Sequence, residues 1–452
     1  MKNNGLLLII SAAALLFWGC SSGDDSRQAI VKGQFSASDS MNTADNSLLP
    51  ISLTIVRQDS AEADPDTLFH EETDSSGHFS GSASFREKGR YPVYISKDGN
   101  NIGRFGVILA EDDTLEITGE LSNLEETLNI SSREHDAMQK LGRLNNGFQR
   151  IARYANAGRL SDDSLEQELD KWSDLYFELY QENEQTRAGS LAAAEAIRLL
   201  QGWNGEKMMN RIRSVQDNDD LVYLGLNYGK DYLARSRGLQ PTLAYLDTLS
   251  DLTEGTQQLK NIERERIKLL YDSARISAAQ ERLDEFRQQY AEDSVAMEWA
   301  ESIDYDLNYL SPGDELPSFE FSSNGKTTSR DSLLGRPYIL EITRLSNELY
   351  QEQFDRTVVI HSIYKNYDLE VVTIPLDESQ ITVDAFFDER VRAWPVADAQ
   401  AFDRDELLEK FNIRLIPTRF LVDSEGEIIR KYVGREYQEV IKGIQTLLNQ
   451  DQ

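Results

Sequence analysis

The spacing of apolar residues changes twice along this chain, and each spacing permits a different kind of structure. Residues 28–122 place apolar residues in short alternating runs between turn residues, which is typical of β-strands. Residues 131–309 place them at steps of three and four, which is typical of helices that bury one face. Residues 310–449 alternate short apolar runs with helical spacing. The 452 residues therefore predict a multidomain α+β protein with an N-terminal β-sandwich, an all-helical middle and a C-terminal α/β region.

The predicted β-sandwich, residues 28–122, has turn signals about every ten residues, as short strands in a sandwich require. The turns are acidic, but no segment has the alternating carboxylate spacing of a calcium loop, so solvated turns are expected. The strands are expected at Ile30–Phe35, Leu49–Val56, Tyr91–Ile95, Arg104–Leu109 and Thr114–Ile117.

The helical middle, residues 131–309, is broken by glycine at positions 158, 202, 238 and 255. These breaks predict seven to nine helices, and the aromatic stripes on them are expected to be core. No fixed-period repeat is visible, so both a solenoid and an irregular bundle stay open. One helical face carries Leu165, Leu169, Trp172, Tyr176 and Leu179.

The C-terminal region predicts the order strand, helix, strand, helix, hairpin, helix. The first pair is a strand at 338–342 and a helix at 346–367. Further strands are expected at 369–374, 419–422 and 428–433, and further helices at 405–411 and 438–449. This order is that of the thioredoxin fold.

The first twenty residues predict a targeting segment. Lys2 precedes an apolar run from Leu6 to Trp18, which is too short to span a bilayer. The run ends at Gly19–Cys20, and this pattern resembles a bacterial lipoprotein signal. The resemblance implies a signal peptide at 1–19, an acylated Cys20 and a tether at 20–27. Ser21 then favours the outer membrane, and the following Ser-rich, acidic tract resembles a surface-export signal, so the periplasmic and surface faces stay open.

The acidic composition limits the partners. The chain has 78 Asp and Glu residues against 47 Lys and Arg, a net charge of −31, and no basic cluster. Nucleic-acid binding needs clustered cations to neutralise phosphates, so no nucleic acid is expected as a partner. Contact with a membrane is expected only through the lipid on Cys20.

Several motifs in the C-terminal region carry a resemblance to a known family. The segment 312–319, Pro-Gly-Asp-Glu-Leu-Pro-Ser-Phe, resembles the entry motif of the TlpA/ResA and AhpC/TSA branch of the thioredoxin superfamily. Residues 411–423 resemble the stretch of this family that contains a cis proline, here Pro417. The resemblance implies that the backbone of Ile416, beside Pro417 and Thr418, pairs with an extended polypeptide. The order of strand and turn signals in residues 28–122 likewise resembles the N-terminal sandwich domain of Bacteroidetes envelope lipoproteins.

The redox motif of that family is missing here. The family has a Cys-x-x-Cys motif at the start of the first helix. The N-terminus of that helix lowers the pKa of the first cysteine thiol. This chain has one cysteine, Cys20, and the matching positions are Ser346 and Leu349. Ser346 is expected to cap the helix, with Glu348 favourable in its first turn. His361 lies some four turns away, so a Ser–His pair is not expected.

No other catalytic or metal-binding pattern stands out. The histidines at 70, 78, 135 and 361 have no metal-ligand spacing, and residues 320–327 are not a phosphate-binding loop. We expect no catalytic residue, no metal and no cofactor. The predicted function is a redox-inactive module in the cell envelope that binds an envelope protein or peptide segment. The alternatives are a thiol–disulfide oxidoreductase of the TlpA or AhpC/TSA kind, and a passive spacer whose helical middle binds a partner.

Overall fold

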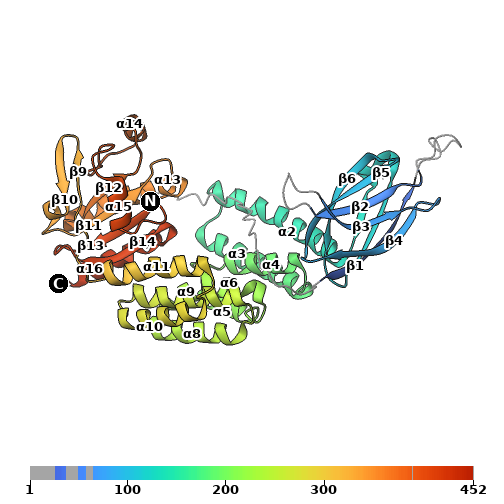
Figure 1. The fold of residues 1–452 in the computed structure, drawn as a ribbon, viewed down its shortest axis with the longest axis horizontal. Helices are drawn as coiled ribbons and strands as arrows, with labels where there is room; N and C mark the ends of the chain where they lie inside the picture. The colour runs from blue at the N-terminus through green and yellow to red at the C-terminus, as the bar shows by residue number, and fades with distance from the viewer. Residues whose placement is uncertain (1–25, 37–48, 58–64, 389, 451–452) are drawn as a thin grey trace. The chain divides into compact units, whose positions relative to one another are not determined.

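A computed structural model describes residues 26–36, 49–57, 65–388 and 390–450 (Figure 1). The predicted signal peptide and Cys20 lie outside these residues. The chain divides into two compact units, Met1–Arg235 and Ser236–Gln452. This boundary falls inside the predicted helical middle. The bounds of the three predicted domains remain a prediction.

The first unit contains two four-stranded sheets. One has the order β4 (His78–Phe85), β1 (Arg27–Ser36), β7 (Thr114–Glu120), β8 (Asn129–Ser131). The other has the order β3 (Asp66–Glu72), β2 (Ser52–Arg57), β5 (Gly89–Lys97), β6 (Asn100–Leu109). Inward side chains of both sheets, among them Val31 and Leu115 from one and Leu53 and Val93 from the other, form one hydrophobic cluster. Buried residues alternate in β1, β5 and β7, as the sequence predicted, whereas β3 and β4 lie where no strand was expected.

Helices follow the sheets in this unit. The predicted breaks at Gly158 and Gly202 occur, and both glycines adopt positive φ, which a residue with a Cβ rarely does. A π-helical turn, Gly225–Gly229, interrupts the last helix. The helices are α1 (Leu124–Thr127), α2 (Arg133–Asn156), α3 (Asp162–Glu182), α4 (Arg187–Arg198), α5 (Gly205–Arg213), α6 (Val222–Leu224) and α7 (Lys230–Ser236).

The second unit begins with four helices, α8 (Leu239–Leu252), α9 (Thr256–Asp272), α10 (Ile276–Gln289) and α11 (Ser294–Tyr309). Counting residues 222–236 as one helix, residues 133–309 form nine helices, within the predicted number.

A four-stranded sheet follows, with the order β12 (Glu370–Pro375), β11 (Tyr338–Thr343), β13 (Thr418–Val422), β14 (Ile428–Val433). β11 runs parallel to β12 and antiparallel to β13. Every residue of β11 and β13 is buried, because both faces of the sheet are covered. The covering helices include α13 (Glu348–Tyr364), α15 (Arg404–Lys410) and α16 (Val440–Gln450).

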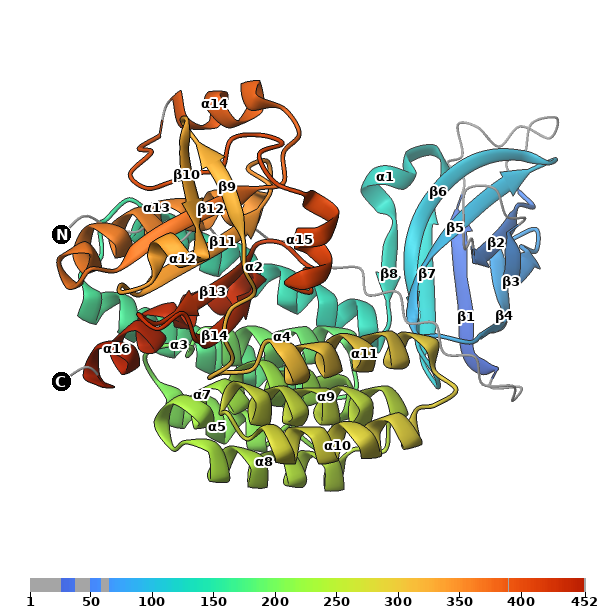
Figure 2. The same ribbon diagram turned by 60° about the vertical axis from the view of Figure 1, so that its left-hand side comes forward.

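Four elements in this part of the chain were not predicted. β9 (Glu320–Ser323) and β10 (Lys326–Ser329) form a separate hairpin, visible in Figure 2, which leads into the short helix α12 (Arg330–Leu333). Helix α14 (Gln380–Asp388) follows β12. All the strands and helices predicted for residues 338–449 are present, with ends shifted by up to three residues.

A buried ionic contact joins helix α11 to the sheet. The Nζ atom of Lys431, on β14, lies 2.8 and 2.9 Å from the two carboxylate oxygens of Asp306 on α11. Asn412 donates a further hydrogen bond to Asp306, at 2.7 Å. Burial lowers the pKa of Lys431, and the charge of Asp306 opposes that shift. The carboxylate of α11 therefore completes the polar interior of the C-terminal region.

Candidate functional site

The turn between β11 and α13 contains the two positions that match the redox motif. Helix α13 is capped by Asn347, whose side chain accepts a hydrogen bond from the Tyr350 amide at 2.9 Å. The predicted cap, Ser346, is wrong by one residue: its side chain is exposed, and the backbone enters the helix only after Asn347. The carboxylate of Asp377 accepts from the Leu345 amide at 2.8 Å and fixes the turn from the side. The cap is worth about 1 kcal/mol to a helix.

The Ile416–Pro417 peptide bond is cis, as predicted. Pro417 is buried, and its carbonyl accepts a hydrogen bond from the Gly434 amide at 2.8 Å. Thr418 is buried as well, and its hydroxyl donates to the Leu415 carbonyl at 2.6 Å. Arg414, Leu415 and Ile416 keep surface in this loop, and Leu415 is 66% exposed.

The turn and the cis-proline loop meet, although 69 residues separate them. Asn347 Nδ2 lies 3.4 Å from the carbonyl oxygen of Ile416. Leu349, in the first turn of α13, approaches the backbone of Gly434: a Cβ added there would lie 3.7 Å from Leu349 Cδ2. The structure therefore brings Asn347 to Ile416, and Leu349 to Gly434, the hydrogen-bond partner of Pro417. The Ser346 side chain forms no hydrogen bond within the described part of the chain.

The backbone of Ile416 is less open than the sequence predicted. Its carbonyl already accepts one hydrogen bond, from Asn347, although a carbonyl oxygen has two lone pairs and can accept another. Its amide has no hydrogen-bond acceptor among the residues that the structure describes. One donor and one half-used acceptor, next to the exposed Leu415, are what a passing β-strand can pair with.

A buried polar network lies beneath the turn, and the sequence analysis missed it. Glu341, in the middle of β11, has no exposed surface, and neither has Arg419 on β13. Arg419 Nε donates to Glu341 at 2.7 Å, and Thr373 donates to the same carboxylate at 2.8 Å. Tyr350 and Thr357 complete the set, at 3.3 and 3.2 Å. Burial raises the pKa of Tyr350 well above its usual range, and the neighbouring Glu341 adds to that shift.

This network extends to the cis-proline loop. Arg419 Nη1 donates to Gln353 at 2.7 Å, and Gln353 donates to the Gly434 carbonyl at 3.1 Å. The Gly434 amide in turn donates a hydrogen bond to the carbonyl of Pro417. The sequence signal that could have indicated the network is a single charged residue in each of two otherwise largely apolar strands: Glu341 in 338–342 and Arg419 in 418–422.

His361 does not approach the turn. It lies on α13, with Nε2 3.5 Å from Glu370 and its ring 5.5 Å from that of Trp394. No hydrogen bond or ion pair joins it to Ser346 in the described chain, so His361 is not placed as a base for Ser346.

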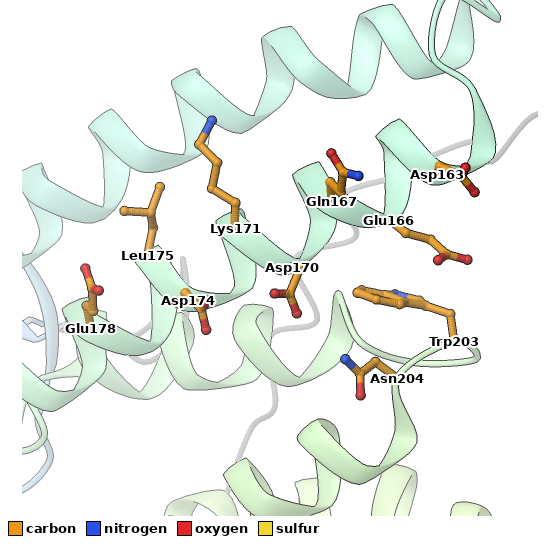
Figure 3. Close-up of a pocket in the computed structure, with 10 residues that line it drawn as sticks. All are labelled: Asp163, Glu166, Gln167, Asp170, Lys171, Asp174, Leu175, Glu178, Trp203 and Asn204. Atoms are coloured by element: carbon orange, nitrogen blue, oxygen red, sulfur yellow. The ribbon is translucent and has the colours of Figure 1, made fainter.

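The first unit has an open groove of about 760 Å³ along α3, which Figure 3 shows. Its walls carry the carboxylates of Asp163, Glu166 and Asp170 on one side and the ring of Trp203 on the other. The Lys207 ammonium lies 2.8 Å from both Asp170 and Asp174, and Arg211 also pairs with Asp174. The inner carboxylates are thus neutralised by the protein's own cations. No cluster of three metal-ligating side chains occurs in the described ranges.

No helix in the described ranges combines the length and the apolar character needed to cross a bilayer.

Comparison with known proteins supports a thioredoxin-like region. No protein-family model matches the chain. The thiol-disulfide oxidoreductase ResA of Bacillus cereus is 22% identical over 139 residues, which cover 30% of this chain and 79% of that protein. ResA of Bacillus subtilis is 24% identical over 141 residues, which cover 31% of this chain and 76% of that protein.

Two solved structures are similar over the same share of the chain. The thioredoxin domain of a thiol-disulfide oxidoreductase from Bacteroides vulgatus is 17% identical, with a TM-score of 0.28, and covers 30% of this chain and 97% of that one. A thioredoxin-family thiol:disulfide interchange protein from Chlorobium tepidum is 23% identical, with a TM-score of 0.27, and covers 30% and 97%. A thioredoxin-like domain of the ResA kind is therefore matched over about 30% of this chain.

Proposed function

We propose that this chain is a lipid-anchored protein of the bacterial cell envelope whose thioredoxin-like region binds an extended polypeptide segment without exchanging disulfides. One observation supports the binding: Asn347 and Ile416 join the turn to the cis-proline loop and leave the Ile416 amide without an acceptor in the described chain. Strand pairing with that backbone supplies affinity, and the side chains around it supply selectivity.

The chemistry of the turn supports the absence of redox activity. Disulfide exchange begins with a thiolate that attacks a sulfur atom. The turn and first helical residues here are Ser346, Asn347, Leu349 and Tyr350, and the single cysteine of the chain is Cys20. If Cys20 is acylated as proposed, its sulfur is a thioether and cannot attack a disulfide.

Lipidation of Cys20 is tested by metabolic labelling with a fatty-acid analogue. We expect label on the native chain and none on Cys20→Ser, which should also leave the membrane fraction. Equal labelling of the two chains would contradict the anchor. Fractionation of inner from outer membrane, and protease treatment of whole cells, then test the proposed outer-membrane location and which face it occupies.

Binding at the loop is tested by photo-crosslinking in native envelopes. A photoreactive amino acid replaces Leu415, which is 66% exposed beside Ile416. The control replaces Ile381, which is 80% exposed on α14. We expect Leu415 to yield a discrete adduct whose cross-linked residue, located by mass spectrometry, lies in an extended segment of an envelope protein. The proposal fails if both positions give the same adducts.

The second candidate is a thiol–disulfide oxidoreductase, which the similarity to the two ResA proteins favours. It requires a thiol that this chain lacks beyond Cys20. Reduction of insulin disulfides by purified Cys20→Ser protein, above the rate with dithiothreitol alone, would establish this activity and overturn the redox-inactive proposal. We expect no increase.

A further inference from the structure

The loops around Pro417 form a surface whose charge is opposite to that of the chain as a whole. We propose that this surface selects acidic extended segments, in which carboxylates flank an apolar residue. The inference rests on the proposed function, because it names the chemistry of the segment that binds there.

Three loops meet at this surface. The turn 344–347 reaches the loop 411–417 through the contact between Asn347 and Ile416, at 3.4 Å. The loop 411–417 reaches residues 434–435 through the hydrogen bond from the Gly434 amide to Pro417, at 2.8 Å. The loop 411–417, which carries the unused amide of Ile416, therefore contacts both of the other loops.

Each loop contributes one exposed arginine: Arg344, Arg414 and Arg435. Arg414 Nε donates to the Asn412 side chain at 3.1 Å, which still leaves the rest of its guanidinium for a ligand. Across the described ranges, none of the three forms an ion pair with Asp or Glu. We call these three residues the arginine rim.

The segments that build the surface also lack carboxylates. Residues 342–347, 411–418 and 428–435 contain no Asp or Glu, although 78 of the 452 residues of the chain, about one in six, are acidic. An ordinary part of this chain would place several carboxylates among these positions. Their absence leaves the arginine rim uncompensated by its own loops.

The carboxylates nearest in the fold are mostly in use. Asp377 accepts from the Leu345 amide, and Glu436 pairs with Lys268 at 2.8 Å. Glu341 is buried against Arg419. Glu348, exposed in the first turn of α13, is an opposing charge next to the turn, and the positive end of the helix accounts for its place there.

The binding chemistry follows from these groups. A guanidinium presents a fork of N–H donors that matches a carboxylate, which makes the arginine rim selective for Asp and Glu side chains. Between the arginines, the exposed Leu415 and the half-buried Ile416 offer apolar surface. Because side chains alternate along a strand, an extended segment can direct apolar residues to this surface and carboxylates to the rim.

The net charge of −31 sharpens this selection. An acidic segment is repelled by most of the protein, and it is attracted only where carboxylates are missing. At physiological ionic strength charges are screened beyond about 8 Å, so the rim dominates over the distant negative charge once the segment arrives.

The test uses three fluorescent octapeptides of alternating sequence, (Val-Glu)₄, (Val-Gln)₄ and (Val-Lys)₄, with the full chain purified in detergent. Fluorescence anisotropy at physiological ionic strength gives their affinities. We expect (Val-Glu)₄ to bind about tenfold more tightly than (Val-Gln)₄, as three exposed charge contacts allow, and (Val-Lys)₄ to bind least.

Two triple variants complete the test. Arg344→Gln/Arg414→Gln/Arg435→Gln should remove the preference for (Val-Glu)₄. The control, Lys326→Gln/Lys365→Gln/Lys442→Gln, makes the same change in net charge at exposed positions elsewhere in this unit and should keep the preference. If (Val-Gln)₄ binds as tightly as (Val-Glu)₄, or the control loses the preference equally, charge selection is overturned while the binding function stands. If no peptide binds, both proposals fall.

Discussion

Arg419 Nε lies 2.7 Å from Glu341 Oε1, and neither side chain has any exposed surface. The two charges belong to neighbouring strands in the middle of the sheet, directly beneath the turn that leads into α13. The guanidinium also lies over the ring of Tyr437, 3.8 Å from its centroid. The electrostatic attraction between the two charges is strong in this buried, water-free site. Each ion has also lost its hydration, and only good geometry and further hydrogen bonds offset that cost.

Removal of one member of this pair should be severe. Glu341→Gln leaves a buried guanidinium without a counter-charge, and we expect a loss of about 3–5 kcal/mol in the free energy of unfolding of this region. The double change Glu341→Leu/Arg419→Met should cost less than the single one, since it buries no charge. Hydrogen exchange of the amides in 338–343 and 418–422 reports this region alone. Glu348→Gln, at an exposed position, is the control and should change exchange little; a single variant as stable as the native chain would contradict the ion-pair account.

Substitutions at Asn347 and at Ser346 should have different effects, because only Asn347 caps helix α13. Asn347→Ala removes the acceptor of the Tyr350 amide and the donor to Ile416, so we expect a loss of about 1 kcal/mol. Ser346→Ala, one residue earlier and exposed, should have no measurable effect. Exchange of the Tyr350 amide measures the cap directly. Equal protection in the two variants would mean that the helix begins without Asn347.

Tyr432 should make the protein sensitive to alkali. Burial raises the pKa of Tyr432 to about 12, with Arg430 opposing the shift and Asp272 adding to it. The folded state therefore holds this proton longer than the unfolded state, whose tyrosine titrates near 10. Its contribution to stability is complete below pH 10 and is lost as the pH rises toward 12.

Tyr432→Phe tests this linkage. Its hydroxyl has no hydrogen-bond partner among the described residues, so Phe should be neutral or slightly stabilising at pH 7. The loss of stability between pH 10 and 12 should be shallower in this variant, as followed by urea unfolding at a series of pH values. Tyr367→Phe is the control, since Tyr367 is 58% exposed, and it should leave the pH profile unchanged.

The contact between helix α11 and the sheet can be tested by comparing two carboxylates on different faces of that helix. Asp306→Asn leaves the Lys431 ammonium buried without a full counter-charge, and we expect a loss of about 3 kcal/mol or more. Asp304→Asn, two residues away, breaks a partly exposed pair with Arg287 at 3.1 Å and should cost about 1 kcal/mol or less. Calorimetric unfolding of the full chain compares the two variants. Equal losses would show that Asp306 acts as a surface residue.

The sequence could predict those parts of the fold that depend on neighbouring residues. The alternation of apolar and polar residues predicted β1 and β5, and apolar residues at steps of three and four predicted α3 and α13. It missed β8, whose three residues form a strand only through pairing with β7. It also missed α14, a helix of nine residues in which Val383 and Phe386 are the buried positions, too few for a clear period.

In the candidate site too, the local feature was predicted from the sequence and the long-range contacts were not. The cis bond before Pro417 could be predicted because the motif around it is local. The contact of Asn347 with Ile416 spans 69 residues, and that of Glu341 with Arg419 spans 78. Neither pair leaves a periodic signal, since long-range contacts depend on how the strands are ordered in the sheet.

The bond between Asp306 and Lys431 bears on how this protein can be divided, by experiment or by recombination of genes. A fragment that starts at residue 310 would keep the buried ammonium of Lys431 and lose helix α11 with the Asp306 carboxylate that neutralises it. A fragment that keeps this pair must begin before α11, and Ser236, where the second compact unit begins, is a boundary that keeps α8 to α11 together with the sheet.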